Sequence, residues 1–220
     1  MTTNRTTSVP TERVRLWRRP FRVIRENLRV YLIINAAAYG LALIGFSLGL
    51  LFPDLVAERA VGLEEDGTGE LVRTLFETPP LFALVIFAVN VFGLAGLRIV
   101  LPSLIVPFAG LPLFGYWAVT TGVTIVPTSA PGWVLFIPHS LTLVIEFQAY
   151  VLLLLGAYLI GKGWLVPRSV GAANRRRGYL FGLRRLGLLA LPALVLFVIG
   201  AVWEAYSLRY LVGPLGELLL

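Results

Sequence analysis

The most informative stretch of the chain is residues 138–161, which read PHSLTLVIEFQAYVLLLLGAYLIG. It is almost entirely apolar after its first residues, and its 24 residues would rise about 36 Å as a helix at 1.5 Å per residue. That length exceeds the roughly 30 Å hydrocarbon core of a bilayer. The stretch therefore predicts a membrane-spanning helix that has Pro138 as its first residue, a position that proline tolerates well.

The composition of the whole chain agrees with this prediction. Hydrophobic residues make up 57% of the 220 residues and charged residues only 14%, whereas soluble domains carry about 25% charged residues. Other apolar stretches of similar length recur along the chain, so the sequence predicts an all-α, polytopic membrane protein with a bundle of about five transmembrane helices. The predicted spans are residues 30–52, 81–97, 104–126, 138–161 and 186–206.

The third predicted span differs from the others because it is rich in helix-breaking residues. Pro102, Pro107 and Pro112 lie in or beside it, together with Gly110 and Gly115, and proline removes a backbone donor and clashes with the preceding turn. We expect a tight, broken connection around residues 99–106 and a Pro/Gly-broken third span. Irregular backbone of this kind persists at membrane depth only where protein or a wet cavity covers it.

Charged residues are distributed unevenly between the ends of the spans. Eight arginines precede the first span, and seven basic residues lie between Lys162 and Arg185 with no acidic residue among them. Between the first two spans, seven acidic residues oppose only Arg59 and Arg73. This alternation follows the positive-inside rule and predicts a multi-pass protein of the cell membrane with a cytoplasmic N-terminus and an external C-terminus.

The net charge of +7 is interpreted in the same way. The basic blocks flank apolar runs and contain no nucleic-acid-binding motif, so we expect contacts with anionic lipids of the bilayer and no nucleic acid. Residues 1–29 are predicted to be a cytoplasmic arm with a basic amphipathic helix from Thr11 onward, kinked or divided at Pro20. A solvated arm is the alternative. Residues 213–220 are predicted to be a C-terminal tail.

Several classes of functional site are disfavoured by the residue inventory. The chain has no cysteine and a single histidine, which excludes disulfides and thiolate metal sites and argues against a zinc site built by the protein alone. HExxH is absent, and His139-Ser140 does not by itself make a catalytic triad. We therefore predict no catalytic residues, no metal-binding residues and no cofactor.

Polar residues within the spans are the remaining candidates, because ionisable groups in a membrane are costly and mark functional sites by default. The predicted intramembrane polar cleft contains three ionisable residues, one residue at the edge of a span and two neutral polar residues: His139, Glu146 and Glu204, then Arg98, then Asn90 and Gln148.

His139 and Glu146 are seven residues apart, so they share one helix face about 10.5 Å apart along the axis. They could line a proton or ion path, contribute to a metal site completed by another span, or serve as interhelical hydrogen-bond anchors. We expect that neither faces lipid, and that Asn90 or the carbonyl groups near Pro107 and Pro112 approach Glu146. The aromatic residues that follow, among them Tyr150, are expected on other faces of the helix.

Short motifs in this region resemble those of a known family. Residues 137–140 (IPHS), followed by residues 146–149 (EFQA), are similar to the Pro-His…Glu…Ala signature of the stage II sporulation protein M family. Other features in the same order include Glu26-Asn27 after the basic arm, Asn90 in the second span and Trp203-Glu204-Ala205 near the end of the last span. The resemblance covers roughly residues 20–212.

The resemblance implies a five-span integral membrane scaffold or assembly protein without enzymatic activity, which in spore formers anchors peptidoglycan hydrolases. Its expected partners are the lipid bilayer, other membrane or envelope proteins and other copies of itself. The polar intramembrane residues and the broken third span leave a second hypothesis open, a small channel or transporter subunit. An enzyme acting on a lipid or membrane-bound substrate is the third.

Overall fold

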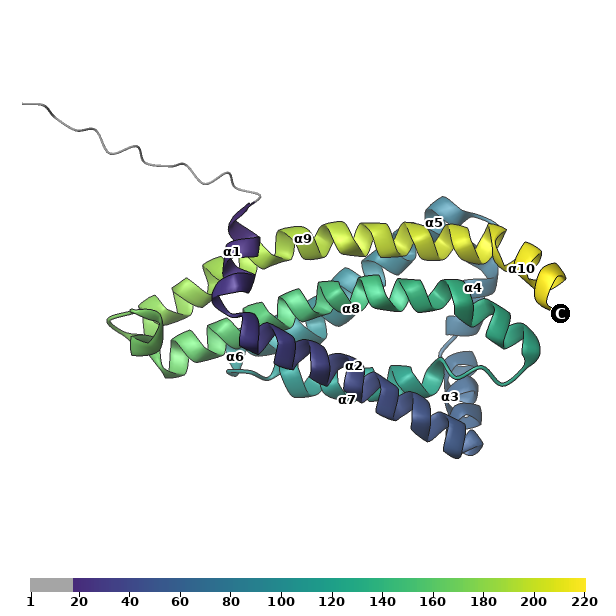
Figure 1. Cartoon of the computed structure of the whole chain (residues 1–220), viewed down its shortest axis with the longest axis horizontal. Coiled ribbons are helices and arrows are strands. Elements are labelled where there is room, and N and C mark those ends of the chain that lie inside the picture. Colours follow the sequence, from purple (N-terminus) through teal and green to yellow (C-terminus); the bar gives the residue numbers. More distant parts are fainter. Residues whose placement is uncertain (1–17) are drawn as a thin grey trace, which may run out of the picture.

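The structure is a computed structural model, and residues 18–220 are described. It is all-α, and four of its helical stretches are long and apolar enough to cross a membrane. Figure 1 shows them running along the long axis of the molecule. These four stretches are α2 (Leu28–Leu51), the continuous run Pro79–Ile105, α8 (Ala130–Leu165) and α9 (Arg175–Tyr210).

The other elements are shorter and lie between or beside these four. Proline is the first residue of two of them, as expected for a residue whose missing N–H costs nothing in a first turn. They are α1 (Arg19–Glu26), α3 (Pro53–Glu65), α4 (Thr68–Leu75), α7 (Gly110–Thr124), the 3-10 helix η3 (Pro167–Val170) and α10 (Val212–Leu219).

One continuous helical run, Pro79–Ile105, covers the residues that the sequence predicted as the second span and most of the broken connection after it. It consists of α5 (Pro79–Ala88), the π-helix η2 (Val89–Val100) and α6 (Leu101–Ile105). The expectation of a break at residues 99–106 was wrong in position, because Pro102 lies in the first turn of α6, where proline is tolerated. The helix ends at Ile105, and the following turn contains Phe108, whose φ of 66° lies in the left-handed region.

The expected third span is correspondingly shorter than predicted. Its helix, α7, has 15 residues and rises about 22 Å, which is less than the roughly 30 Å hydrocarbon core. Residues 18–220 therefore contain four helices of spanning length where the sequence predicted about five spans. Figure 1 shows α7 beside α2, leading from the α6 end of the molecule towards the end where α3 lies.

The fourth and fifth predicted spans are both longer in the structure. α8 begins at Ala130, where the Ser129 hydroxyl accepts a hydrogen bond from the Gly132 N–H at 3.2 Å. Pro138 is therefore inside the helix, and the prediction that it is the first helical residue was wrong. α9 begins at Arg175, capped by the Asn174 side chain, so most of the basic segment expected as a loop is helical.

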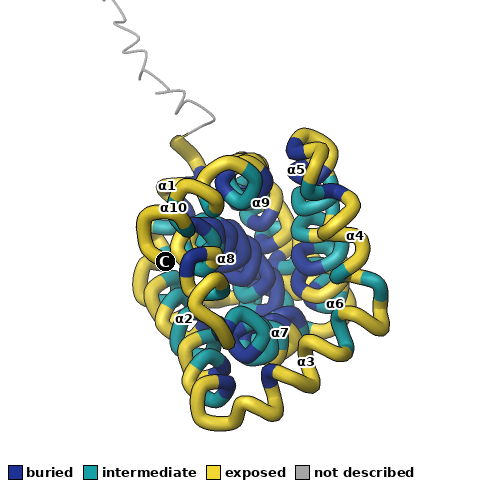
Figure 2. Tube along the Cα trace, turned by 90° about the vertical axis from the view of Figure 1, so that its right-hand side faces the viewer, coloured by how far each residue is buried: buried dark blue, intermediate teal, exposed yellow. Residues whose placement is uncertain are grey.

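The core is built around α8. In the most apolar stretch of this helix 72% of the residues are buried, compared with 17% to 33% in the other three long helices. Figure 2 shows α8 as the buried centre of the bundle, surrounded by helices with exposed outer faces. Exposed leucine and valine side chains on the outer helices are expected where the solvent is lipid.

Glycines allow the closest helix contacts. Gly163 of α8 lies against the backbone of Gly178 in α9, and Gly45 of α2 lies against the backbone of Val119 in α7. Small residues permit such close approach between membrane helices, where van der Waals packing drives association. Gly49, one turn after Gly45 in α2, has a similar packing role, because it lies against the Val126 side chain.

An ion pair joins α1 to α9. Arg185 of α9 contacts Glu26 of α1 at 2.6 Å. Of the amphipathic arm predicted for residues 1–29, the part before residue 18 lies outside the described residues, and Pro20 is in the first turn of α1 instead of dividing it.

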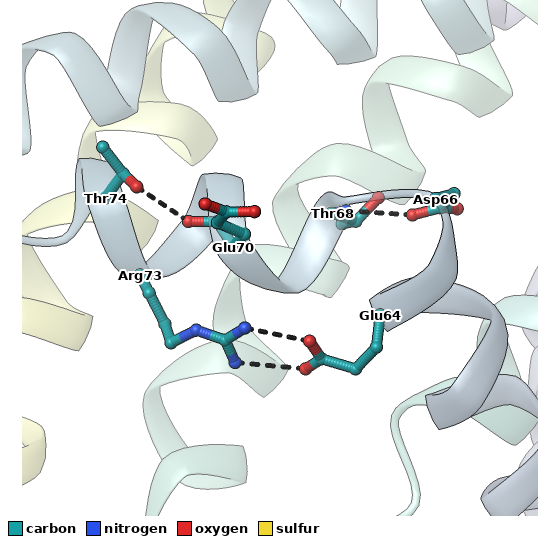
Figure 3. Close-up of polar contacts among 6 residues, drawn as sticks. All are labelled: Glu64, Asp66, Thr68, Glu70, Arg73 and Thr74. Atoms are coloured by element: carbon teal, nitrogen blue, oxygen red, sulfur yellow. Dashed lines mark hydrogen bonds and ion pairs between the residues drawn. The ribbon is translucent and has the colours of Figure 1, made fainter.

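The predicted outer loop, residues 53–80, forms the hairpin of α3 and α4. Figure 3 shows Arg73 facing the Glu64 carboxylate, which it contacts through two hydrogen bonds of 3.1 and 2.9 Å. These hydrogen bonds and the charge of Arg73 hold the pKa of Glu64 below its usual value. Asp66 accepts from the Thr68 N–H at 3.0 Å, which orders the turn between the two helices.

Candidate intramembrane polar site

The predicted polar residues are not gathered in one cleft. The structure divides them into three groups and leaves one outside. Asn90 and Glu146 form the first group, His139 and Glu204 the second, and Gln148 belongs to a third group with residues of α2. Arg98 is exposed on η2 and joins none of the three.

The first group lies at the contact of η2 with α8. Glu146 is only 8% exposed and accepts a hydrogen bond from the Asn90 side-chain amide. The Asn90 carbonyl oxygen in turn accepts from the Tyr150 hydroxyl at 2.9 Å. The approach of Asn90 to Glu146 that the sequence suggested is present. Tyr150 does not lie on another face, because four residues after Glu146 it shares the same one.

The second group lies nearer the α3–α4 end, between α8 and α9. His139 Nδ1 is 3.1 Å from Glu204 Oε1, and the two side chains are 24% and 15% exposed. His139 is the tenth residue of α8, so it does not occupy the first turn as predicted. The Trp203 indole N–H donates to the Pro138 carbonyl at 3.0 Å beside this pair.

The third group joins α2 to α8 on another side of the central helix. The Gln148 amide donates to Asn35 at 2.8 Å and to the Tyr39 hydroxyl at 2.9 Å, and its carbonyl accepts from the Tyr31 hydroxyl at 2.8 Å. The Tyr39 hydroxyl also donates to the Val144 carbonyl at 3.0 Å. Every polar atom of the Gln148 side chain thus has a partner.

Sequence reasoning missed the tyrosines that complete these groups. Tyr31, Tyr39 and Tyr150 each carry a hydroxyl on an otherwise apolar ring, and a buried tyrosine hydroxyl usually finds a partner. Spacing provided a usable signal for all three. Tyr150 is four residues from Glu146, and Tyr31 and Tyr39 are four residues on either side of Asn35.

A separate apolar groove lies between α2, α7 and α8, towards the α3–α4 end. Its volume is about 390 Å³, and its lining includes Leu43, Phe46, Thr121, Trp133 and Phe136. The rings of Phe46 and Phe136 are 5.6 Å apart and belong to different helices. The groove is almost entirely apolar and opens to the side of the bundle, so it has the chemistry of a binding surface for hydrocarbon or apolar side chains.

The hypothesis of a metal site completed by another span is not supported by residues 18–220. No group of three or more histidine or acidic side chains in this range could hold a metal ion. Comparison with protein-family models, with curated proteins and with solved structures found no match to this chain. The resemblance to the stage II sporulation protein M family stays a prediction from the sequence motifs.

Proposed function

We propose that this protein is a non-enzymatic scaffold or assembly protein of the cell membrane. The observation that carries the proposal is the set of hydrogen bonds that the buried polar side chains make between helices. Asn90 and Glu146 join η2 to α8, and Gln148 joins α8 to α2. Polar residues used in this way hold helices in a fixed arrangement, which is what a docking platform requires.

The groove between α2, α7 and α8 is the proposed docking surface, and its occupant is a transmembrane helix of another membrane or envelope protein. A helix with its side chains is about 10–12 Å wide. A groove of about 390 Å³ is too small to hold such a helix as a whole, so the helix backbone would lie outside it. Large apolar side chains on one face of that helix would enter the groove, as knobs do between packed helices. The aromatic side chains of Trp133 and Phe136 offer the flat surfaces that such side chains pack against.

The charge distribution supports one orientation of the protein in the membrane. The acidic α3–α4 hairpin would lie outside the cell, and the arginine-rich beginnings of α1 and α9 would contact anionic lipids at the cytoplasmic face. The short helix α7 would make the third of five crossings, at a locally thinned part of the bilayer. The family resemblance suggests the same arrangement and the same scaffold role.

Photo-crosslinking in membranes tests the docking surface. A photoreactive residue at Leu43, which is 65% exposed on the groove, is expected to give a protein adduct of one discrete mass. The matched control is Leu191, which is 57% exposed on α9 and should give no such adduct. Ser140→Phe, which fills the groove, should abolish the Leu43 adduct while leaving the folded yield unchanged. Adducts with lipid alone at both positions would contradict the proposal.

A channel or transporter subunit is the second candidate, and the His139–Glu204 pair favours it. Histidine and acidic side chains in close contact within a membrane are common in proton and ion pathways. Liposome flux measurements with the wild type and Glu146→Gln distinguish the two functions. Transport that exceeds that of empty liposomes and is lost in the variant would support a transporter, and flux equal to empty liposomes under several ion gradients would exclude it.

A further inference from the structure

The hydroxyl of Thr142 is buried without a hydrogen-bond partner. It is the one such side-chain atom in the part of the chain that the structure describes, and Thr142 is 0% exposed. A threonine in a helix usually donates to the carbonyl three or four residues earlier. Here the carbonyl four residues earlier belongs to Pro138 and accepts from the Trp203 indole at 3.0 Å. Because the hydroxyl makes no hydrogen bond in the structure, it is available to a bound molecule.

The position of Thr142 shows which polar groups such a molecule would connect. His139 is three residues before it and Glu146 four residues after it, so the three side chains share one face of α8. From α9, Gly200 lies against the Glu146 side chain, where an added Cβ would be 3.0 Å from the Glu146 Cγ. Glu204 is one turn further along α9 and contacts His139 at 3.1 Å. Thr142 thus lies between the His139–Glu204 pair and the buried Glu146 carboxyl group.

This row of polar groups has one open end. His139 and Glu204 are 24% and 15% exposed at the end nearer the α3–α4 hairpin. Further along α8, Tyr150 is 0% exposed and residues 151–155 are buried and apolar, which closes the row on that helix. A row that is open at one end and closed at the other suits exchange of protons with one side only.

We propose that a water molecule binds the Thr142 hydroxyl and connects the His139–Glu204 pair to Glu146. Buried waters typically make about three hydrogen bonds to polar groups that lack partners. Such a water would donate a proton to the Glu146 carboxylate while accepting one from the His139 side, so it is regenerated and no other reactant is needed. Glu146 thereby becomes a proton-binding site reached from the end of the bundle where His139 lies. This site is additional to the scaffold function and independent of the groove.

The titratable groups around this site come from two helices. α8 contributes His139 and Tyr150, and α9 contributes Glu204. η2 contributes the uncharged amide of Asn90, while its Arg98 is exposed. The tyrosines of α2 contact Gln148 instead, and α7 presents the rings of Phe114 and Trp117 to Tyr150.

Infrared spectroscopy of the purified full-length protein tests the proposal. Glu146→Gln identifies the carboxylic acid band of Glu146, and transfer into D₂O measures how fast this group exchanges its proton. Thr142→Val removes the hydroxyl with almost no change in volume and is expected to slow the exchange at least about tenfold, the effect of 1.4 kcal/mol on a barrier. Thr142→Ser keeps the hydroxyl and should restore fast exchange.

Thr124→Val is the matched control, because the Thr124 hydroxyl already donates to the Thr120 carbonyl at 2.8 Å in α7. It should leave the exchange rate of Glu146 unchanged. Equal exchange rates in the wild type and in Thr142→Val would overturn the proposal. So would the absence of any Glu146 carboxylic acid band between about pH 5 and 9, since an ionised group throughout that range would bind no proton there.

Discussion

Asn90 lies at the centre of the buried polar contacts between η2 and α8. Its amide donates to Glu146 and its carbonyl accepts from Tyr150, so one side chain provides partners for two buried groups. Removing a partner leaves a buried group unsatisfied, which costs more than the net worth of the hydrogen bond itself. The sequence identified Asn90 and Glu146 as polar residues within spans, and Tyr150 lies four residues after Glu146, but only the rotation of η2 against α8 shows that Asn90 contacts both.

Asn90→Leu is therefore expected to lower the free energy of unfolding in detergent by about 1–3 kcal/mol, because two buried polar groups lose their partner. Thermal unfolding or unfolding in sodium dodecyl sulfate measures the change. The matched control is Val89→Leu at the neighbouring position, which is 58% exposed and should change stability little. Equal stability of the two variants would show that Asn90 has no anchoring role.

At the scale of elements, α8 and α9 form the most closely packed pair in the bundle. Gly163 and Gly178 bring the two backbones together near the η3 end, and Gly182 lies against the backbone of Ile160. The sequence predicted both helices but underestimated their lengths, because it detected only their apolar parts. Backbone hydrogen bonds continue through the basic residues at the beginning of α9, since arginine is a good helix former.

Gly178→Ala is expected to destabilise the protein by about 1–3 kcal/mol, because the added Cβ would overlap the backbone of Gly163 and force the helices apart. Gly187→Ala is the control in the same helix, since no atom lies within 4 Å of its added Cβ. That variant should be neutral or more stable by up to about 1 kcal/mol, from helix propensity alone. Thermal unfolding of both variants in detergent checks the difference, and a stable Gly178→Ala protein would contradict the close packing.

For the whole molecule, the number of crossings depends on α7. The four long helices are apolar enough to span a membrane by themselves, whereas α7 has 15 residues and needs thinner surroundings to do so. Five crossings would put the α3–α4 hairpin and the α8–α9 connection on opposite sides of the membrane. Four crossings, without α7, would put them on the same side.

Cysteine labelling of this cysteine-free chain distinguishes the two arrangements. Glu65→Cys at the end of α3 and Ala173→Cys before α9 are both exposed positions. We expect a membrane-impermeant maleimide to label Glu65→Cys in intact cells and Ala173→Cys only after the membrane is opened, in line with the positive-inside rule. Labelling of both variants in intact cells, or of neither, would show that α7 does not cross.

The sequence by itself determined the class of the protein, because helix length and hydropathy are properties of consecutive residues and need no knowledge of the packing. It also identified the residues whose burial is costly, among them Glu146 and His139. Only the tertiary structure decided their partners, since these depend on how each helix is rotated and how far it is shifted along its neighbour. Glu204 meets His139, Gln148 meets the tyrosines of α2, and Trp203 occupies the Pro138 carbonyl that Thr142 would otherwise use. No spacing within one helix contains that information.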